Sequence, residues 1–515
     1  MTEIYIMLAV YFIALFILSY IAAKRVTNLK NFLTGGKRLG YWVAAFSAQA
    51  TGESAWLLLG LTGMGALIGV SAYWVVVGEV IGVSIAWFLM ANRFKRLTDH
   101  YDSVTVIDYL VSRFRTPNHT LRLVAALSLT VFVLIYISAQ IDATGSAFER
   151  FLRWDYHVGA IVGFVIVVAY CVIGGFLAVA WTDMFQGAMM LGCLVLLPLV
   201  AYFSINDHNA LISGLETIDP NLLNFWGGHD STMMALMTIL GMMLIGLGFL
   251  GSPQVFARFI AIKDSEEIAR GKWVAVLFTF LVGTSAVSIG ILGRFLFTQA
   301  GADPVIALGN GAQNVLPTLV EYTFPALIVG LYVAAVLSAI MSTVSSLLIL
   351  STSCIANDFY RKVINPDLTG HHAARLSRYI TLGLALLALC IALLVSVISP
   401  SRTIFWFVIF GWSGIAATFC PMLILSLFWK RYNARGALAS MISGFVAIPL
   451  FKFVAPDIDV IGPYFSALES LPPAFAVSLL AGYIVTVMSP SSSEVWNYSA
   501  DLDAALSPAK LANID

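Results

Sequence analysis

This sequence contains very little charge. Lysine, arginine, aspartate and glutamate make up only 11% of its 515 residues, whereas a soluble domain carries about 25%. The 28 basic and 28 acidic residues balance, which excludes a strongly basic surface for nucleic acid. The five cysteines lie in or beside apolar runs without metal-ligand spacing or a disulfide framework. We therefore predict that they are small packing residues: Cys171, Cys193, Cys354, Cys390 and Cys420.

Long apolar runs are abundant instead. Hydrophobic residues make up 60% of the chain, and its mean hydropathy is +0.90. A membrane span needs about 20 apolar residues. The first run has no small-residue cleavage site, so we interpret it as a span rather than a signal peptide. The sequence predicts an all-α polytopic membrane protein with about thirteen spans, at residues 4–22, 41–67, 71–91, 121–140, 158–178, 184–204, 232–252, 272–298, 322–351, 376–398, 403–428, 435–454 and 470–488.

Basic residues alternate between the two sides of the predicted spans. They gather in the loops after spans one, three, seven, nine and eleven, and they are absent from the loops after spans two and six. Because cytoplasmic loops carry the excess of lysine and arginine, this pattern predicts an N-terminus outside and a C-terminus in the cytoplasm. Arg150 and Arg153 are the main contrary residues.

The second predicted span is interrupted at its centre by polar and small residues. The stretch from Ser47 to Trp56 contains Gly52 and the carboxylate of Glu53. A charge in hydrocarbon costs at least about 2.5 kcal/mol. Interrupted backbone at membrane depth survives only where protein buries it or where it lines a cavity. This segment therefore predicts a binding site, with a helix kinked only for packing as the alternative.

The seventh predicted span is interrupted as well. It contains the glycine-rich stretch Gly246-Leu-Gly-Phe-Leu-Gly251 and ends at Pro253, five spans after the first break. Discontinuous helices in corresponding positions of two halves indicate a transporter site near the bilayer midplane. Their free carbonyls suit a cation, and their free N–H groups suit a carboxylate.

The ninth predicted span is rich in hydroxyl groups. Ser338, Ser342, Ser345 and Ser346 lie three or four residues apart and therefore share one helix face. Hydroxyl and carbonyl oxygens are suitable ligands for sodium, whereas helix packing alone is the alternative interpretation. Asp183 stands at the start of span six, where it is either functional or a first-turn helix carboxylate.

Other polar and aromatic residues lie at membrane depth. Glu79 in span three is interpreted as structural or interfacial, as is Arg294 in span eight. Four aromatic residues form either a wall around a solute or ordinary membrane packing: Trp56, Tyr136, Phe249 and Trp412.

Several of these stretches resemble the sodium:solute symporter family, and within it the bacterial sodium/proline symporters. The similarity spans nearly the whole chain. It is carried by Phe32 to Gly40, Ser54 to Leu61, Gly174 to Gln186, Gly246 to Pro253 with Ala257-Arg-Phe259, Ala339-Ile-Met-Ser-Thr343, and Leu425 to Arg431.

The resemblance implies a LeuT-type core of two inverted five-helix repeats. It divides the chain into a peripheral helix with its loop (1–40), a first repeat (41–204), an extracellular loop (205–231), a second repeat (232–430), peripheral spans (431–490) and a cytoplasmic tail (491–515).

The resemblance also implies the site residues. The sodium ligands are expected to be the backbone carbonyls of Ala50, Glu53 and Ala339 and the hydroxyls of Ser342 and Thr343. A further cation site, or a path for cation release, is expected at Asp183, Ser345 and Ser346. The solute pocket is expected to contain Ser54, Ala55, Trp56, Tyr136, Phe249 and Pro253.

The chain departs from the proline branch at some of these positions. The branch has an aspartate where this chain has Gly52, a glycine at Ala55, an aromatic residue at Ile245 and a tyrosine at Phe249. The carboxylate falls one residue later, at Glu53. It either replaces the aspartate, carries a proton, or is hydrogen-bonded into the helix break.

These features predict a sodium-coupled importer of L-proline or a similar small amino acid, with no enzymatic activity, in the bacterial cytoplasmic membrane. Its expected partners are the solute, sodium and the lipid bilayer. Two alternatives stay within transport: a sodium- or proton-coupled symporter of another carboxylate-bearing solute, and a channel. A solute-sensing membrane module is the remaining one, although only about 25 residues follow the last predicted span.

Overall fold

A computed structural model of the chain describes residues 1–24, 34–116, 118–205, 207, 209–229, 231–365, 370–489 and 500–503. Within these ranges every regular element is helical, and the one β-bridge joins Leu39 to Ile262. Residues 25–33 of the first predicted basic loop lie outside the described ranges, as does most of the predicted tail.

The first half of the chain contains the helices that carry the first break. Its segments are α1 (Thr2–Ala23), α3 (Tyr41–Gly52), η1 (Trp56–Leu61), α4 (Thr62–Ile68), η2 (Gly69–Ala72), α5 (Tyr73–Ile85), η3 (Ala86–Met90), α6 (Ala91–His100), α7 (Val106–Phe114), α8 (Thr120–Leu152), α9 (Tyr156–Phe203), α10 (Asn209–Ile218) and η4 (Pro220–Leu223).

The second half contains the other break and the hydroxyl-rich helix. Its segments are α11 (Thr232–Met243), η5 (Leu244–Leu250), α12 (Pro253–Ala261), α13 (Ser265–Phe297), α14 (Pro304–Leu308), η6 (Asn310–Ala312), α15 (Val315–Thr323), α16 (Ala326–Ser353), η7 (Cys354–Ile364), α17 (Gly370–Ile398), α18 (Ile404–Phe428), α19 (Ala434–Pro449), η8 (Leu450–Val454), η9 (Ala455–Asp457), α20 (Gly462–Leu468) and α21 (Leu471–Met488).

All thirteen predicted spans fall on helical segments. In the described part of the chain, eleven helices are long and apolar enough to cross a membrane. The difference has two causes. The end of the second span and the third span form one run from 56 to 100, which turns at Gly69 (φ 61°), and the fifth span lies in the first part of α9, of which Tyr156–Ala169 counts among the shorter apolar helices. Gly175 (φ 60°) separates that helix from span six, because glycine tolerates positive φ.

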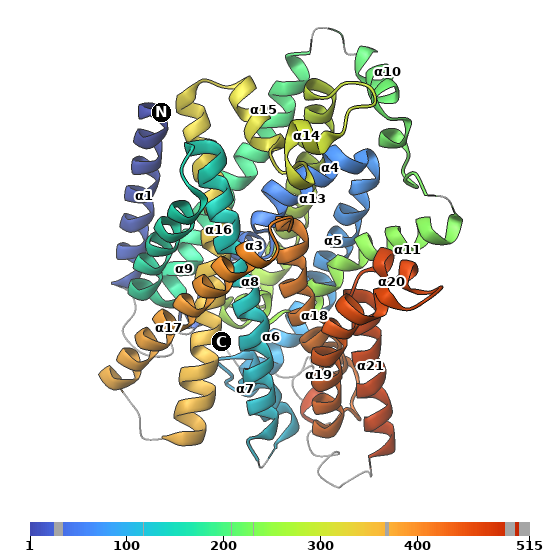
Figure 1. Cartoon of the computed structure of the whole chain (residues 1–515). Coiled ribbons are helices and arrows are strands. Elements are labelled where there is room, and N and C mark those ends of the chain that lie inside the picture. Colours follow the sequence, from blue (N-terminus) through green and yellow to red (C-terminus); the bar gives the residue numbers. More distant parts are fainter. Residues whose placement is uncertain are drawn as a thin grey trace.

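Burial separates a central group of helices from a peripheral one. In α16 and α18, 83% of the most apolar segment is buried inside the protein, against 28% in α1 and in α17. Figure 1 shows α3, α8, α13 and α16 crossing the middle of the molecule, while α1 and α17 lie at one side and α19 and α21 at the other. The polar segments of the predicted second and ninth spans are therefore central.

The two interrupted helices lie against each other and against α5. The Leu39 N–H donates to the Ala261 carbonyl at 3.1 Å, which joins the start of α3 to the end of α12. A Cβ added to Gly246 of η5 would lie 2.0 Å from the Gly78 carbonyl of α5. Only glycine permits this approach, so the glycine-rich stretch is a packing surface as well as a helix break.

Candidate functional site

The site begins where α3 ends. Glu53 has an extended conformation (φ −87°, ψ 97°), and the helix resumes as η1 at Trp56. The last carbonyls of a helix have no partner within it. Here side chains supply the donors: Ser342 donates to the Ala50 carbonyl at 2.8 Å, and Thr343 donates to the Thr51 carbonyl at 3.2 Å. The break in α3 therefore presents backbone oxygens directly to α16.

Five neutral oxygens gather between α3 and α16. The hydroxyls of Ser342 and Thr343 also each lie 3.1 Å from the Ala339 carbonyl, which is one turn earlier in α16. This oxygen cluster consists of the carbonyls of Ala50, Thr51 and Ala339 and the hydroxyls of Ser342 and Thr343, and all five residues are completely buried. Hard oxygen ligands of this kind suit a small hard cation.

Four of the five residues expected to bind sodium contribute oxygens to the oxygen cluster. The structure brings Ala50, Ala339, Ser342 and Thr343 together as expected. The carbonyl that Thr343 contacts belongs to Thr51, whereas the expected carbonyl was that of Glu53. The Glu53 backbone has left the helical path, so its carbonyl no longer follows those of α3.

A buried ion pair occupies the predicted further cation site. Arg258 of α12 lies 2.9 Å from Asp183 of α9, and its Nε donates to Ser47 at 3.0 Å. Ser47 and Ser346 donate to the same Asp183 oxygen at 2.7 and 3.3 Å, and Arg258 also contacts Ser346. All four side chains are at least 97% buried. The guanidinium thus supplies the positive charge beside Asp183.

Arg258 is not among the predicted site residues, because it falls in the basic stretch that follows the seventh predicted span. Ser345 also differs from the expectation, since its hydroxyl donates to the Ser342 carbonyl in its own helix. Of the two candidate serines, the structure therefore joins Ser346 to Asp183. Thr51 connects this network to the oxygen cluster, because its hydroxyl lies 3.1 Å from that of Ser346.

The other side of the α3 break presents Ser54 to α8. The Ser54 hydroxyl accepts hydrogen bonds from Gln140 at 3.0 Å and from Tyr136 at 3.4 Å. The Ala55 N–H donates to the Gln140 amide oxygen at 3.3 Å. Gln140 was missed in the sequence, although it lies four residues after Tyr136 and hence on the same helix face.

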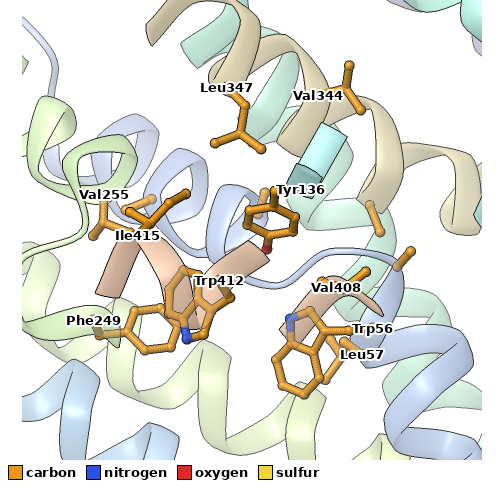
Figure 2. Close-up of a cluster of buried hydrophobic side chains, with 14 of the residues drawn as sticks. Trp56, Leu57, Tyr136, Phe249, Val255, Val344, Leu347, Val408, Trp412 and Ile415 are labelled. Carbon is orange, nitrogen blue, oxygen red and sulfur yellow. The ribbon is translucent and has the colours of Figure 1, made fainter. Parts of the chain in front are cut away.

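Aromatic rings surround this polar group. Figure 2 shows Trp412 of α18 beside Phe249 and facing Tyr136, with Trp56 across from them. The ring centroids of Phe249 and Trp412 are 5.1 Å apart, and those of Tyr136 and Trp412 are 6.4 Å apart, both in edge-to-face arrangements. Trp56 instead packs against Phe405 at 5.9 Å. The four aromatic residues considered in the sequence are thus buried around Ser54.

The two broken helices meet at these rings. A Cβ added to Gly52 would lie 2.7 Å from the Phe249 ring of η5. Pro253 opens α12 after Ser252, whose hydroxyl bonds the Gly248 carbonyl at 2.5 Å. The predicted solute residues therefore belong to one buried region formed by both interruptions.

Charged networks flank the site. On one side, Asp142 of α8 contacts Arg402 and Tyr156, next to a cavity of about 320 Å³ that Leu59 of η1 also lines. On the other, Arg122 of α8 contacts Asp108 and Asp358 at 2.9 and 2.7 Å. The first network joins α8 and α9 to the segment before α18, and the second joins α8 to α7 and η7.

Comparison with known proteins agrees with this architecture. A model of the sodium:solute symporter family matches residues 32–444. The high-affinity proline transporter PutP of Bacillus subtilis (strain 168) is 32% identical over 482 residues, which cover 93% of this chain and 96% of that protein. A sodium/proline symporter of Staphylococcus aureus (strain JH9) is 29% identical over 490 residues, covering 94% and 92%.

A solved structure shows the same fold. A sodium-coupled sialic acid symporter in a substrate-bound, outward-open state superposes with a TM-score of 0.76 at 18% identity, covering 96% of this chain and 99% of that one. The expected LeuT-type fold is confirmed. The chain is a transporter rather than an enzyme, with sodium as its coupling ion, and it belongs to the sodium:solute symporter family.

Proposed function

We propose that this protein imports L-proline, or a closely similar small amino acid, together with sodium by alternating access. Its relatives of similar length include proline transporters, over more than nine-tenths of both chains. The observation that carries the proposal is the break in α3. Ala50 and Thr51 face the oxygen cluster on one side of the break, and Ser54 and Ala55 face Gln140 on the other.

The solute chemistry follows from the groups at the start of η1. The first N–H groups of a helix lack partners within it and carry partial positive charge, which favours a carboxylate. The Gln140 amide and the Ser54 hydroxyl add donors within the same few residues. The rings of Tyr136, Phe249 and Trp412 offer an apolar wall to a compact ring such as that of proline.

Sodium would couple to the solute through the same backbone. In the proposed site, the ion is held by the carbonyls of Ala50, Thr51 and Ala339 and by the hydroxyls of Ser342 and Thr343. By drawing α3 onto α16, it would fix the end of α3 and hence the positions of Ser54 and Ala55. A ligand shifts a conformational equilibrium only through such differential contacts.

One sodium ion per solute is sufficient for this task. Entry of one charge down 100 mV yields about 2.3 kcal/mol. A tenfold sodium gradient adds about 1.4 kcal/mol. Together they support a solute ratio of several hundred. Arg258 favours this stoichiometry, because its guanidinium already neutralises Asp183 where a second cation was expected.

The same account assigns the parts of the chain. We place the two inverted repeats at 41–204 and 232–430, so that α3 and the η5–α12 segment are their equivalent first helices. The protein would lie in the bacterial cytoplasmic membrane with its N-terminus outside. The Asp142–Arg402 contact then closes the outer path, and the contacts of Arg122 with Asp108 and Asp358 close the inner one.

Uptake into proteoliposomes tests the proposal. Labelled proline should accumulate when sodium, but not potassium, forms the inward gradient, and unlabelled carboxylate-bearing solutes should be ranked by competition. Replacing Gln140 with leucine should raise the proline KM more than the sodium concentration for half activation. Sodium-driven uptake of another solute, unaffected by proline, would contradict the assignment of proline but not of symport.

A further inference from the structure

A basic cavity lies where α7, α8 and η7 meet, apart from the residues of the proposed sodium and solute sites. Its volume is about 380 Å³, which is within the usual range for a small-molecule site. The described residues that line it are Val111, Thr116, Asn118, His119, Arg122, Arg361 and Lys362. None of these is acidic, and all but Val111 have a side chain that can donate a hydrogen bond. The lining therefore favours an anion.

The acidic residues behind this cavity neutralise only part of its positive charge. Asp108 and Asp358 are buried, and neither lines the cavity. Arg122 contacts both carboxylates, at 2.9 and 2.7 Å, and Lys362 contacts Asp108. In this group two carboxylates thus balance two cations.

Arg361 supplies a positive charge in excess of that balance. Among the described residues its one hydrogen bond is with the Asn357 amide oxygen at 3.3 Å, and that group is neutral. The Thr116 hydroxyl oxygen is buried and has no hydrogen-bond partner in the same part of the chain. Because buried polar groups are normally paired, this hydroxyl indicates a missing ligand. With His119 neutral, the net charge of the site is +1, which matches a phosphodiester group with its single negative charge.

The start of α8 adds to this positive field. The helix begins at Thr120, and its N-cap residue His119 makes no side-chain capping hydrogen bond. The first N–H groups of a helix lack partners within it, and they carry partial positive charge that favours phosphate groups. His119 and Arg122, in the first turn, both line the cavity, so this end of the helix borders it.

An apolar face continues from the cavity along α8. The Leu123 N–H donates to the His119 carbonyl at 2.9 Å, so His119, Leu123 and Leu127 follow one another on the same side of the helix. Leu123 is 38% exposed and Leu127 is 67% exposed, within the fourth predicted membrane span. A phosphate site that adjoins an exposed apolar face suits a phospholipid, whereas free phosphate needs only the cavity.

We propose that this cavity binds the phosphodiester headgroup of an anionic phospholipid, at the face predicted to be cytoplasmic. Arg361, Lys362 and His119 contact the phosphate, and an acyl chain follows the apolar face of α8. Basic pockets between membrane helices on the cytoplasmic side are typical sites for anionic headgroups. The bound lipid bridges α8 and η7 and so holds the two segments together.

Native mass spectrometry of the whole protein, freed of lipid in detergent, tests this proposal. The wild type should retain one phosphatidylglycerol at concentrations at which phosphatidylcholine is lost, because the choline ammonium group finds no carboxylate in the lining. Arg361→Gln should weaken phosphatidylglycerol binding about fivefold. The matched control is Arg431→Gln, which removes an exposed basic residue that does not line the cavity, and it should bind as the wild type does.

Equal retention of the two lipids by the wild type would overturn the proposal, and so would unchanged phosphatidylglycerol binding in Arg361→Gln. Excess inorganic phosphate should leave the bound lipid in place. If inorganic phosphate displaced it, the ligand would be a soluble phosphate and the assignment to a lipid would be wrong. The comparison of the two lipids on the wild type stands without the variant, should the variant fold poorly.

Discussion

Replacing Ser342 with alanine removes one of the five oxygens proposed to bind sodium. In the structure its hydroxyl bonds the Ala50 carbonyl at 2.8 Å and the Ala339 carbonyl at 3.1 Å. A hydrogen-bonding group that faces a charge contributes about 1.5–3 kcal/mol. At about 1.4 kcal/mol per factor of ten, the sodium concentration for half-maximal uptake should rise roughly 10- to 150-fold.

The solute pocket should be affected only through sodium. At saturating sodium, Ser342→Ala should retain a proline KM close to that of the wild type, because Ser54 and Gln140 keep their contact. The Ala50 carbonyl loses its donor, so the free energy of unfolding should fall by about 1–3 kcal/mol. A thermal melt in detergent at each sodium concentration separates this loss from the change in sodium affinity.

A matched control distinguishes the site from general packing. Ser440 of α19 is also completely buried and donates to a carbonyl, that of Ser478, at 2.7 Å. Ser440→Ala removes the same atom from a helix that does not touch the oxygen cluster, and sodium activation should stay unchanged. If Ser342→Ala were folded and showed wild-type sodium activation, the assignment of the oxygen cluster as the sodium site would be wrong.

Three further predictions concern other parts of the structure. Arg258→Gln leaves a carboxylate buried without its cation, a change that costs about 3–5 kcal/mol, so the variant should melt at a lower temperature unless high sodium restores it. Arg402→Gln breaks the contact with Asp142 and should increase labelling by a membrane-impermeant reagent of a cysteine placed in the adjoining cavity; unchanged labelling would contradict its role in closure. Gly246→Ala should destabilise the protein by about 1–3 kcal/mol or more, because its Cβ would lie 2.0 Å from a carbonyl, whereas Gly192→Ala, which meets nothing within 4 Å, should be tolerated in the same melt.

The helix breaks could be predicted from sequence because their causes are local. Glycine and polar residues at Gly52 and Gly246 are conspicuous within long apolar runs, and the structure interrupts both helices there. The hydroxyl face of the ninth span follows from helical spacing alone, and Ser342 does face α3. Periodicity and composition were therefore sufficient for the elements and for the face that α16 turns toward the break in α3.

Contacts between residues distant in sequence were less predictable. Arg258 reaches Asp183 across 75 positions, and no local pattern distinguishes it from a basic loop residue. Gln140 likewise becomes part of the site only when α8 packs against the break in α3. Whether Thr51 or Glu53 turns its carbonyl toward α16 depends on the residue at which α3 ends. A shift of that end by one residue changes the outcome.

The central claim is that one break in α3 joins the sodium site to the solute site. Isothermal binding of proline to purified protein, measured at low and at saturating sodium, tests this claim most directly. Because coupling between sites is reciprocal, sodium should tighten proline binding by the same factor by which proline tightens sodium binding. Ser342→Ala should leave proline binding nearly independent of sodium at concentrations that saturate the wild type. Equal proline affinity in the wild type with and without sodium would contradict the claim.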